Sequence, residues 1–333
     1  MTQHNSPQID PHPIFILGMN GSGTTMLLDC LNNHPELYGF RGETRVIPHF
    51  ISKLPSYGDI NNDDNFLKLW NDFRSVPILV SCNDGTLPPI PDDWHKRKRC
   101  LGSVIDGIFE YFSSLDGKRR WCEKTPMHAL HISALARVFP GAKFIHMIRD
   151  GRDCAASFHR RWGYNIKRTI CRWKEVILVA QTQGNELPTQ YMELRYEDLT
   201  EQPDIWMRRI CIFLNIEFNE KVLYLSRNQE FSGSTHKSIT PNNAKWKKYY
   251  SQHTLAALDN IAGKQLDALG YPTGQPLADH NPSKVFRIFW ALQDNIRAAI
   301  KKFQKEDKHT KYNFWAQVIA ALRQILTSTL RRP

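Results

Sequence analysis

The sequence predicts an α/β protein in which an open parallel sheet is flanked by helices and followed by a helical C-terminal extension. Apolar runs typical of strands alternate with helical patterns along most of the 333 residues, as in a parallel sheet with crossover helices. The first such strand leads through a glycine-rich turn into a helix. Two amphipathic stripes follow residue 283. These three features favour one large three-layer domain with an appended segment.

The first predicted strand is the apolar run Ile14–Leu17, and a glycine-rich turn follows it. Gly18, Gly23 and Thr25 have the spacing of a phosphate-binding P-loop, and a helical pattern opens directly after Gly23. Free N–H groups at such a helix start favour an anion. Thr24 stands where nucleoside-triphosphate enzymes carry a lysine. The sequence therefore favours a P-loop-type fold and a phosphate-bearing donor other than ATP or GTP.

The remaining elements follow in the order that a parallel sheet requires. Lys143–Ile148 predicts a second strand, and a helix follows from about Cys154. Tyr191–Leu194 predicts a third strand, and Pro203–Leu214 reads as a helix. Residues 52–100 are irregular and rich in Pro, Gly and Asn, so we expect inserted helices and loops there, a usual place for substrate-binding elements.

The composition changes around residues 276–283, and this change predicts a domain boundary. We expect a flexible N-terminus at 1–12, the main domain at 13–275 and a basic amphipathic helical extension at 284–333. The extension carries two apolar stripes, made by Val285, Ile288, Phe289, Leu292, Ile296, Ile300 and Phe303, and by Phe314, Trp315, Val318, Ile319, Leu322, Ile325 and Leu326.

The net charge of +11 belongs mostly to this extension. Residues 284–333 contain eleven Lys and Arg against three acidic residues, a net of +8, so the other 283 residues carry about +3. We therefore predict no nucleic-acid partner. No apolar run has the length of a membrane span, which favours a cytoplasmic protein. Seven scattered cysteines with no metal-ligand spacing predict reduced thiols and no metal site.

Four polar residues lie where a parallel sheet would deliver them to a ligand. Arg149 directly follows a predicted strand, and Ser157 lies two turns into the next helix, an arrangement that suits a second phosphate. Lys124 precedes a helix-starting proline, and Glu43 comes shortly after the first helix. Each also has a structural interpretation: a surface ion pair for Arg149, a solvated face for Lys124, and a cap or a partner of Arg45 for Glu43.

Together, these motifs resemble the sulfotransferases that use 3′-phosphoadenosine 5′-phosphosulfate (PAPS). Gly18–Thr25 is similar to their 5′-phosphosulfate loop, and Phe144–Ser157 to their 3′-phosphate motif. Leu194–Leu199 and Gly270–Tyr271 recur at the expected places, so the resemblance covers roughly residues 13–273.

Within that family the chain resembles tyrosylprotein sulfotransferases. The similarity is carried by Gly42–Pro48, by Ser234–Pro241 and by the pair Lys245 and Trp246. It implies a hydroxyl acceptor, with a protein tyrosine favoured and a carbohydrate or lipid hydroxyl next.

The resemblance also implies where the donor binds. Its 5′-phosphosulfate is expected on the loop, at Gly21, Ser22, Gly23, Thr24 and Thr25. Arg149 and Ser157 are expected to bind the 3′-phosphate, and Tyr196 to contact the nucleotide. Ser234 and Lys245 are expected to line the donor or transfer site.

For the transfer step, the resemblance implies that Glu43 is the general base that takes the proton of the acceptor hydroxyl. Lys124 would neutralise charge on the sulfuryl group and the leaving phosphate, and Arg45 would orient the acceptor. The transferred group carries less charge than a phosphoryl group, so side chains and amides suffice and no metal is expected.

Two positions depart from the family pattern. Gly21 replaces the Arg or Lys that usually precedes Ser-Gly-Thr, so a cation for the leaving phosphate must come from Lys124, Arg41 or Arg45. Animal tyrosylprotein sulfotransferases pair a cysteine beside the Gly-Glu segment with one near the lysine. Here Cys122 is present, but Phe40 and Arg41 precede Gly42. The missing partner favours a reducing compartment.

Two rival functions stay open. A kinase-like phosphotransferase is disfavoured by the missing lysine, and a nucleotide-binding pseudoenzyme is kept open by Gly21. For the extension we expect packing on the main domain first, with peripheral contact to an anionic membrane or dimerisation as alternatives. Its basic stretch Lys301–Lys311 would also suit an acidic acceptor peptide.

Overall fold

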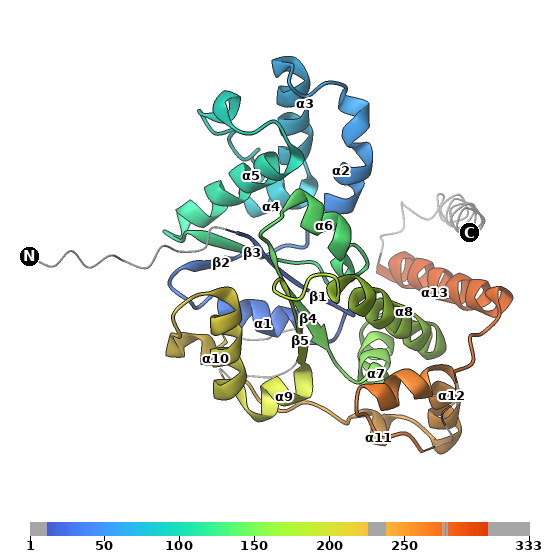
Figure 1. Ribbon diagram of the computed structural model, residues 1–333. Coiled ribbons are helices and arrows are strands. Elements are labelled where there is room, and N and C mark those ends of the chain that lie inside the picture. The colour runs from blue at the N-terminus through green and yellow to red at the C-terminus, as the bar shows by residue number, and fades with distance from the viewer. Residues whose placement is uncertain (1–11, 226–237, 275–276, 278, 306–333) are drawn as a thin grey trace, which may run out of the picture. The chain divides into compact units, whose positions relative to one another are not determined.

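The computed structural model describes residues 12–225, 238–274, 277 and 279–305 (Figure 1). By its internal contacts the chain divides into two compact units. The first comprises Met1–Ile148 and Val176–Asn242, and the second comprises Arg149–Glu175 and Asn243–Pro333. Every strand within the described residues belongs to the first unit.

The described elements follow a strand–helix alternation that is interrupted by one long helical insertion. In chain order they are β1 (Ile14–Gly18), α1 (Thr24–Leu31), β2 (Leu37–Gly39), α2 (Ile47–Lys53), the 3₁₀ turn Leu54–Tyr57, α3 (Asp63–Arg74), α4 (Pro77–Cys82), the 3₁₀ turn Trp94–Lys96, α5 (Leu101–Leu115), β3 (Arg120–Lys124), the 3₁₀ turn Pro126–Leu130, α6 (Ile132–Val138), β4 (Lys143–Ile148), α7 (Gly151–Trp162), α8 (Ile166–Gly184), β5 (Tyr191–Arg195), α9 (Tyr196–Glu201), α10 (Pro203–Leu214), the 3₁₀ turn Glu220–Leu223, α11 (Trp246–Tyr249), α12 (Gln252–Ala268) and α13 (Lys284–Lys305).

The sheet has the order β2-β3-β1-β4-β5, and all neighbouring strands are parallel (Figure 1). Ile16 of β1 is in register with Lys124 of β3 on one side and with Ile145 of β4 on the other. The carboxyl ends of the strands therefore share one edge, where ligands bind in folds of this kind. The predicted α/β architecture is confirmed.

The sheet buries both of its faces, as a parallel sheet must. On one face, Ile14 and Ile16 join a core cluster with α1, α9 and α10. On the other, Phe15 stacks on Phe144 with ring centroids 5.5 Å apart and meets Trp121 edge-on at 5.6 Å. Alternate residues of β1 thus anchor opposite layers, which fixes the strand that leads into the glycine-rich loop.

Most of the elements expected from the sequence are present, with small differences at some boundaries. The strands expected at 14–17, 143–148 and 191–194 and the helix at 203–214 are confirmed, and the first and third of these strands extend one residue further, to Gly18 and Arg195. The helix expected from Cys154 begins earlier, at Gly151, because the Asp150 carboxylate accepts a hydrogen bond from the Arg152 N–H and caps it. The irregular region 52–100 contains short helices and loops inserted between β2 and β3, as expected.

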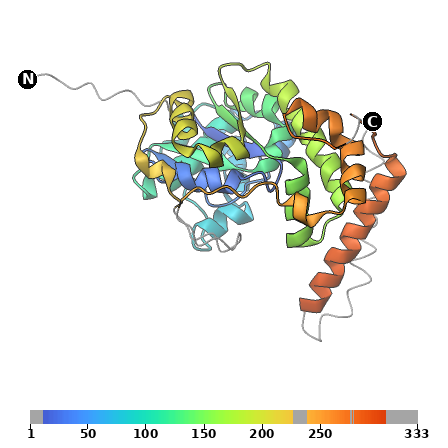
Figure 2. The ribbon, with the colours of Figure 1, turned by 90° about the horizontal axis from the view of Figure 1, so that it is seen from below.

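The second unit contains only helices among its described residues, and α13 is the longest of them (Figure 2). The apolar stripe Phe314–Leu326, expected to form a further helix, lies outside the described residues. No helix in the described part of the chain is long and apolar enough to cross a membrane. All seven cysteines are free, and five of them are buried.

Candidate active site

The glycine-rich loop follows β1 at the carboxyl edge of the sheet, and its backbone takes conformations that favour glycine. Gly18, Gly21 and Gly23 have φ values of 147°, 88° and 100°, all in the left-handed region. The Ser22 N–H donates to the Met19 carbonyl at 3.0 Å, which closes the turn. Gly23 caps α1 without a side chain of its own. The first N–H groups of α1 are therefore not capped by a side chain, as an anion site requires.

The hydroxyl side chains of the loop differ in exposure. Ser22 is fully buried, and within the described part of the chain its Oγ has no hydrogen-bond partner. Thr24 is buried and Thr25 is exposed. A buried hydroxyl without a partner is costly unless a ligand satisfies it. The loop thus fits a bound phosphate-type anion that would accept from Ser22.

Gly18→Ala is expected to destabilise the protein by about 3 kcal/mol, the sum of left-handed strain and overpacking. A Cβ at this position would collide with the Met147 backbone carbonyl, which cannot move without disturbing β4. Urea unfolding measures the change. Gly85→Ala is the matched control, since Gly85 also has positive φ (80°) but a Cβ added there would meet no atom within 4 Å. Equal losses in the two variants would contradict the collision.

Tyr196 lies against the glycine-rich loop. It is buried at the start of α9, directly after β5, and a Cβ on Gly23 would lie 2.5 Å from its Cδ2. The tyrosine ring therefore packs against the loop backbone. This close approach explains why position 23 carries glycine.

Glu43 and Lys124 form an ion pair beside this edge of the sheet. Lys124 ends β3, and its Nζ lies 2.5 Å from Oε1 of Glu43. Arg45 donates to the other oxygen, with Nε and Nη2 2.9 Å and 2.6 Å from Oε2. The structure thus brings these three predicted residues together. The interpretation of Lys124 as a solvated face is wrong, because the side chain is buried; the Arg45 partnership of Glu43 is present.

The two cations keep Glu43 ionised. Burial opposes the charge, but the hydrogen bonds and charges of Lys124 and Arg45 outweigh it and hold the pKa of Glu43 below its ordinary value. A carboxylate that is ionised at neutral pH and still partly exposed is able to accept a proton from a substrate hydroxyl.

Glu123, which the sequence reasoning overlooked, fixes this segment. Its fully buried carboxylate accepts at Oε1 from the Thr44 N–H (3.1 Å), the Thr44 hydroxyl (3.0 Å) and the Thr125 hydroxyl (2.5 Å). His128 Nδ1 lies 3.1 Å from Oε2, although not aligned for a hydrogen bond. Burial raises the pKa of Glu123, but His128 and these hydrogen bonds lower it by more, so that the pKa lies below its ordinary value. The position of Glu123 next to Lys124 in the sequence could have indicated that it belongs to this site.

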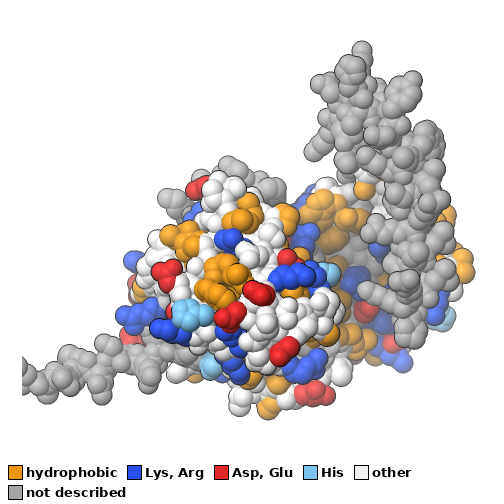
Figure 3. All heavy atoms as spheres, turned by 90° about the horizontal axis from the view of Figure 1, so that it is seen from above, with side chains coloured by type: hydrophobic (Ala, Val, Ile, Leu, Met, Phe, Trp, Pro, Cys, Tyr) orange, Lys and Arg blue, Asp and Glu red, His pale blue; other side chains and the backbone are white. Residues whose placement is uncertain are grey.

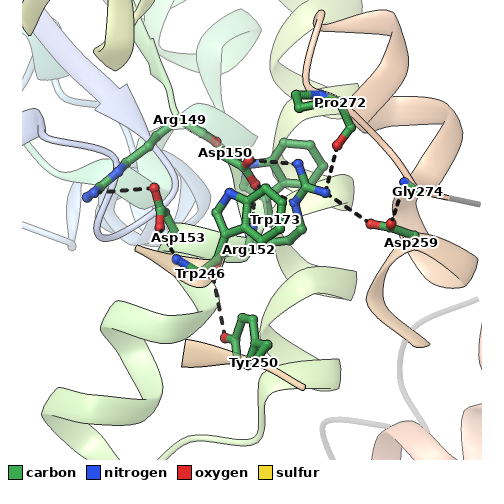
Figure 4. A network of polar contacts seen from close by, with 10 residues as sticks. All are labelled: Arg149, Asp150, Arg152, Asp153, Trp173, Trp246, Tyr250, Asp259, Pro272 and Gly274. Atoms are coloured by element: carbon green, nitrogen blue, oxygen red, sulfur yellow. Dashed lines mark hydrogen bonds and ion pairs between the residues drawn. The ribbon is translucent and has the colours of Figure 1, made fainter. Parts of the chain in front are cut away.

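In the second unit, one carboxylate contacts both Arg149 and the backbone of Trp246, the residue after Lys245 (Figure 4). Arg149 Nη2 lies 3.8 Å from Oδ2 of Asp153, and Oδ1 of Asp153 accepts from the Trp246 N–H at 3.0 Å. Lys245 directly precedes Trp246 and is exposed. Burial raises the pKa of Asp153 despite the nearby Arg149 charge. Asp153 thus connects the guanidinium of Arg149, a group suited to a phosphate, with the segment that carries Lys245.

Ser157 lies one turn after Asp153 on α7 and is buried. The Trp173 indole N–H donates to the Arg149 carbonyl at 2.9 Å and holds that residue's backbone. Thus the structure places Arg149, Ser157 and Lys245 within the second unit, and the loop, Glu43, Arg45, Lys124 and Tyr196 within the first.

Arg152 holds the second unit together around Asp150 and Trp246 (Figure 4). Its guanidinium makes a two-point contact with Asp150 at 3.0 Å and 2.8 Å, and it lies 3.9 Å from the centroid of the Trp246 ring. It also pairs with Asp259 of α12 at 3.2 Å. These contacts fix the turn that carries Lys245, a connection between distant segments that no sequence pattern indicated.

The remaining predictions concern Ser234 and metals. Ser234 lies outside the described residues. Among the residues that the structure describes, no group of three or more His, Cys, Asp or Glu is arranged to hold a metal ion. On the face seen from above, basic and acidic side chains are interspersed (Figure 3).

A sequence model of the sulfotransferase family matches residues 13–220. A putative protein-tyrosine sulfotransferase of Caenorhabditis briggsae is 27% identical over 289 residues, spanning 80% of this chain and 92% of that protein. One from Caenorhabditis elegans is 32% identical over 214 residues, spanning 57% and 82%.

Solved structures show the same fold. The sulfotransferase domain of the Synechococcus PCC 7002 olefin synthase superposes with a TM-score of 0.55 at 22% identity, covering 83% of this chain and all of that domain. The sulfotransferase domain from the curacin biosynthetic pathway gives 0.51 at 20% identity, covering 80% and all of it.

Proposed function

The chain belongs to the sulfotransferase family, and we propose that it transfers a sulfuryl group from PAPS to a hydroxyl, with a protein tyrosine as the favoured acceptor. The observation that carries the proposal is the ion pair of Glu43 and Lys124 at 2.5 Å. Lys124 ends β3, which pairs in register with β1, the strand that leads into the glycine-rich loop. The tyrosine acceptor is supported by the relatives named protein-tyrosine sulfotransferases.

In this proposal the loop holds the donor's 5′-phosphosulfate. The N–H groups of Gly23, Thr24 and Thr25 face the anion, and the buried Ser22 hydroxyl gains the partner that it lacks among the described residues. Gly21 supplies the turn at a φ of 88°, where an arginine or lysine would be strained. Arg149 and Ser157 of the second unit bind the 3′-phosphate, Lys245 lines the donor site, and Tyr196 contacts the nucleotide as well as the loop.

The reaction needs one base and one cation. The acceptor oxygen bonds to sulfur as the bond between sulfur and the phosphate oxygen breaks, and the phosphate leaves with the electron pair. Glu43 takes the acceptor proton, and Arg45 holds both Glu43 and the acceptor. Lys124 moves no proton in this scheme and stabilises the charge of the leaving phosphate, the task that a basic residue at position 21 would share. Ser234 keeps its proposed place at the transfer site.

Calorimetry with 3′-phosphoadenosine 5′-phosphate (PAP) and PAPS, without added metal, tests the donor site. We expect micromolar binding, weakened about tenfold or more by Arg149→Ala, because a charge-assisted contact to phosphate is removed. Arg160→Ala is the control, since Arg160 is exposed on the same helix α7. If the wild type binds neither nucleotide, the proposal fails, and ATP with magnesium becomes the ligand to test.

Acceptor identity is tested separately once PAP binding is measured. Tyrosine peptides with flanking Asp or Glu are incubated with PAPS, and sulfation is read by mass spectrometry against peptides with Phe in place of Tyr. Nucleotide binding without sulfation of any hydroxyl would favour a binding protein over an enzyme. Sulfation of a carbohydrate or lipid alone would replace the tyrosine acceptor.

A further inference from the structure

Helix α13 contacts its own unit through charged side chains. Asp294 is buried; its Oδ1 accepts from the Asn165 N–H at 2.7 Å, and its Oδ2 pairs with Arg168 Nη1 at 2.7 Å. Arg297 donates to the Gly163 carbonyl at 3.1 Å. The polar side of the helix is therefore the side that docks, which is the reverse of the usual amphipathic arrangement.

Three residues of the apolar stripe of α13 are left exposed, while Ile288 and Leu292 of the same stripe are half-buried. Val285, Phe289 and Ile296 are 74%, 53% and 47% exposed, and their spacing of four and seven residues puts them on one line along the helix. Asp294 is nine residues, or two and a half turns, from Val285 and so lies on the opposite side. The helix packs on residues 163–168, which belong to the expected main domain, but Val285, Phe289 and Ile296 of the stripe stay exposed.

The charge of the segment decides which partner fits this surface. Helix α13 has six Lys and Arg, and its one acidic residue, Asp294, is already paired with Arg168. The whole region 284–333 carries +8, so a second copy of this helix or the chain's own end (306–333, net +3) would bring like charge against it. An anionic surface complements it instead.

We propose that α13 docks the protein on an anionic lipid surface, with Val285, Phe289 and Ile296 inserted at the boundary between headgroups and acyl chains. Exposed apolar residues with Lys and Arg on the flanks are the signature of helices that lie in this interface. Each basic residue near an anionic surface adds roughly fivefold to binding. The proposal does not depend on the sulfotransferase reaction.

Co-sedimentation of the full chain with vesicles tests the surface. Vesicles of phosphatidylcholine with about 30% phosphatidylglycerol are compared with pure phosphatidylcholine, at low and high salt. We expect the wild type to bind the anionic vesicles about tenfold or more tightly, and less at high salt. Phe289→Ser/Ile296→Ser should reduce that binding about tenfold or more.

The control pair is Ile205→Ser/Ile212→Ser, which removes two exposed isoleucines (47% and 77%) from α10 and should leave vesicle binding unchanged. Val285→Ser/Phe286→Ser provides a second test if the first variant unfolds on heating earlier than the wild type. The proposal is overturned if both α13 variants bind like the wild type, or if the wild type binds no vesicle. A dimer that Phe289→Ser/Ile296→Ser dissociates, without vesicle binding, would assign the surface to a second copy.

Discussion

Glu43→Gln is expected to lower kcat by ~10²–10⁴-fold, the usual contribution of a general base. The amide keeps the size of the carboxylate and an oxygen that accepts from Lys124, but it cannot take a proton. Glu43 contacts Lys124 and Arg45 rather than the loop. The affinity for PAP should therefore stay within about twofold of the wild-type value, which is less than the loss of one hydrogen bond would cause. The loss should therefore appear in kcat and not in nucleotide binding.

The measurement is steady-state sulfation of a tyrosine peptide, with calorimetry of PAP as the second readout. Glu201→Gln serves as the control, because Glu201 is exposed at the end of α9 and outside the contacts of Glu43. A Glu43→Gln enzyme that keeps more than about a tenth of the wild-type kcat would place the base elsewhere. Loss of PAP binding in this variant would instead show that Glu43 shapes the donor site.

The elements that could be predicted from the sequence are those coded locally. The strand, turn and helix at 14–31 depend on an apolar run, glycines with positive φ and a following amphipathic pattern, all within eighteen residues. The strand at 143–148 is likewise an apolar run bounded by polar residues. In both places local propensity and tertiary structure agree, so the pattern suffices.

Strand β3 could not be predicted, because its residues are buried by distant partners. Arg120 is fully buried and donates to the carbonyls of His12 and Leu214, the latter at 2.5 Å. Glu123 and Lys124 are buried and pair with Thr44 and Glu43, which lie some eighty residues earlier in the chain. A segment rich in charged residues is predicted to be exposed unless the groups that pair with those charges are known. The loop and the two second-unit residues predicted to bind phosphate, Arg149 and Ser157, were found by motif, whereas Glu123 was not.

Lys124→Met is expected to lower kcat by ~10²–10³-fold, as for removal of one preorganised charge at a transition state. It should also change the pH dependence. Lys124 lowers the pKa of Glu43, while burial raises it. Without the ammonium group the carboxylate becomes protonated at higher pH, and a protonated carboxyl cannot act as base. The acid limb of kcat/KM should therefore move to higher pH than in the wild type.

Lys68→Met, an exposed lysine on α3, controls for the loss of one positive charge and should leave both kcat and the pH profile unchanged. An acid limb that stays in place in Lys124→Met, with Glu43→Gln inactive, would mean that another group sets the ionisation of Glu43. Arg45, which makes two contacts to the same carboxylate, is then the candidate.

The double variant Glu43→Gln/Lys124→Met separates the two roles of the lysine. If Lys124 acted only by keeping Glu43 ionised, its loss would cost nothing once Glu43 is an amide, and the double variant would match Glu43→Gln. If Lys124 also stabilises the leaving phosphate, the double variant should have a lower kcat than Glu43→Gln. Its total loss of kcat should be smaller than the product of the two single losses, because the two residues are in contact at 2.5 Å. We expect the second result, since Gly21 leaves the loop without the cation that would otherwise share this charge.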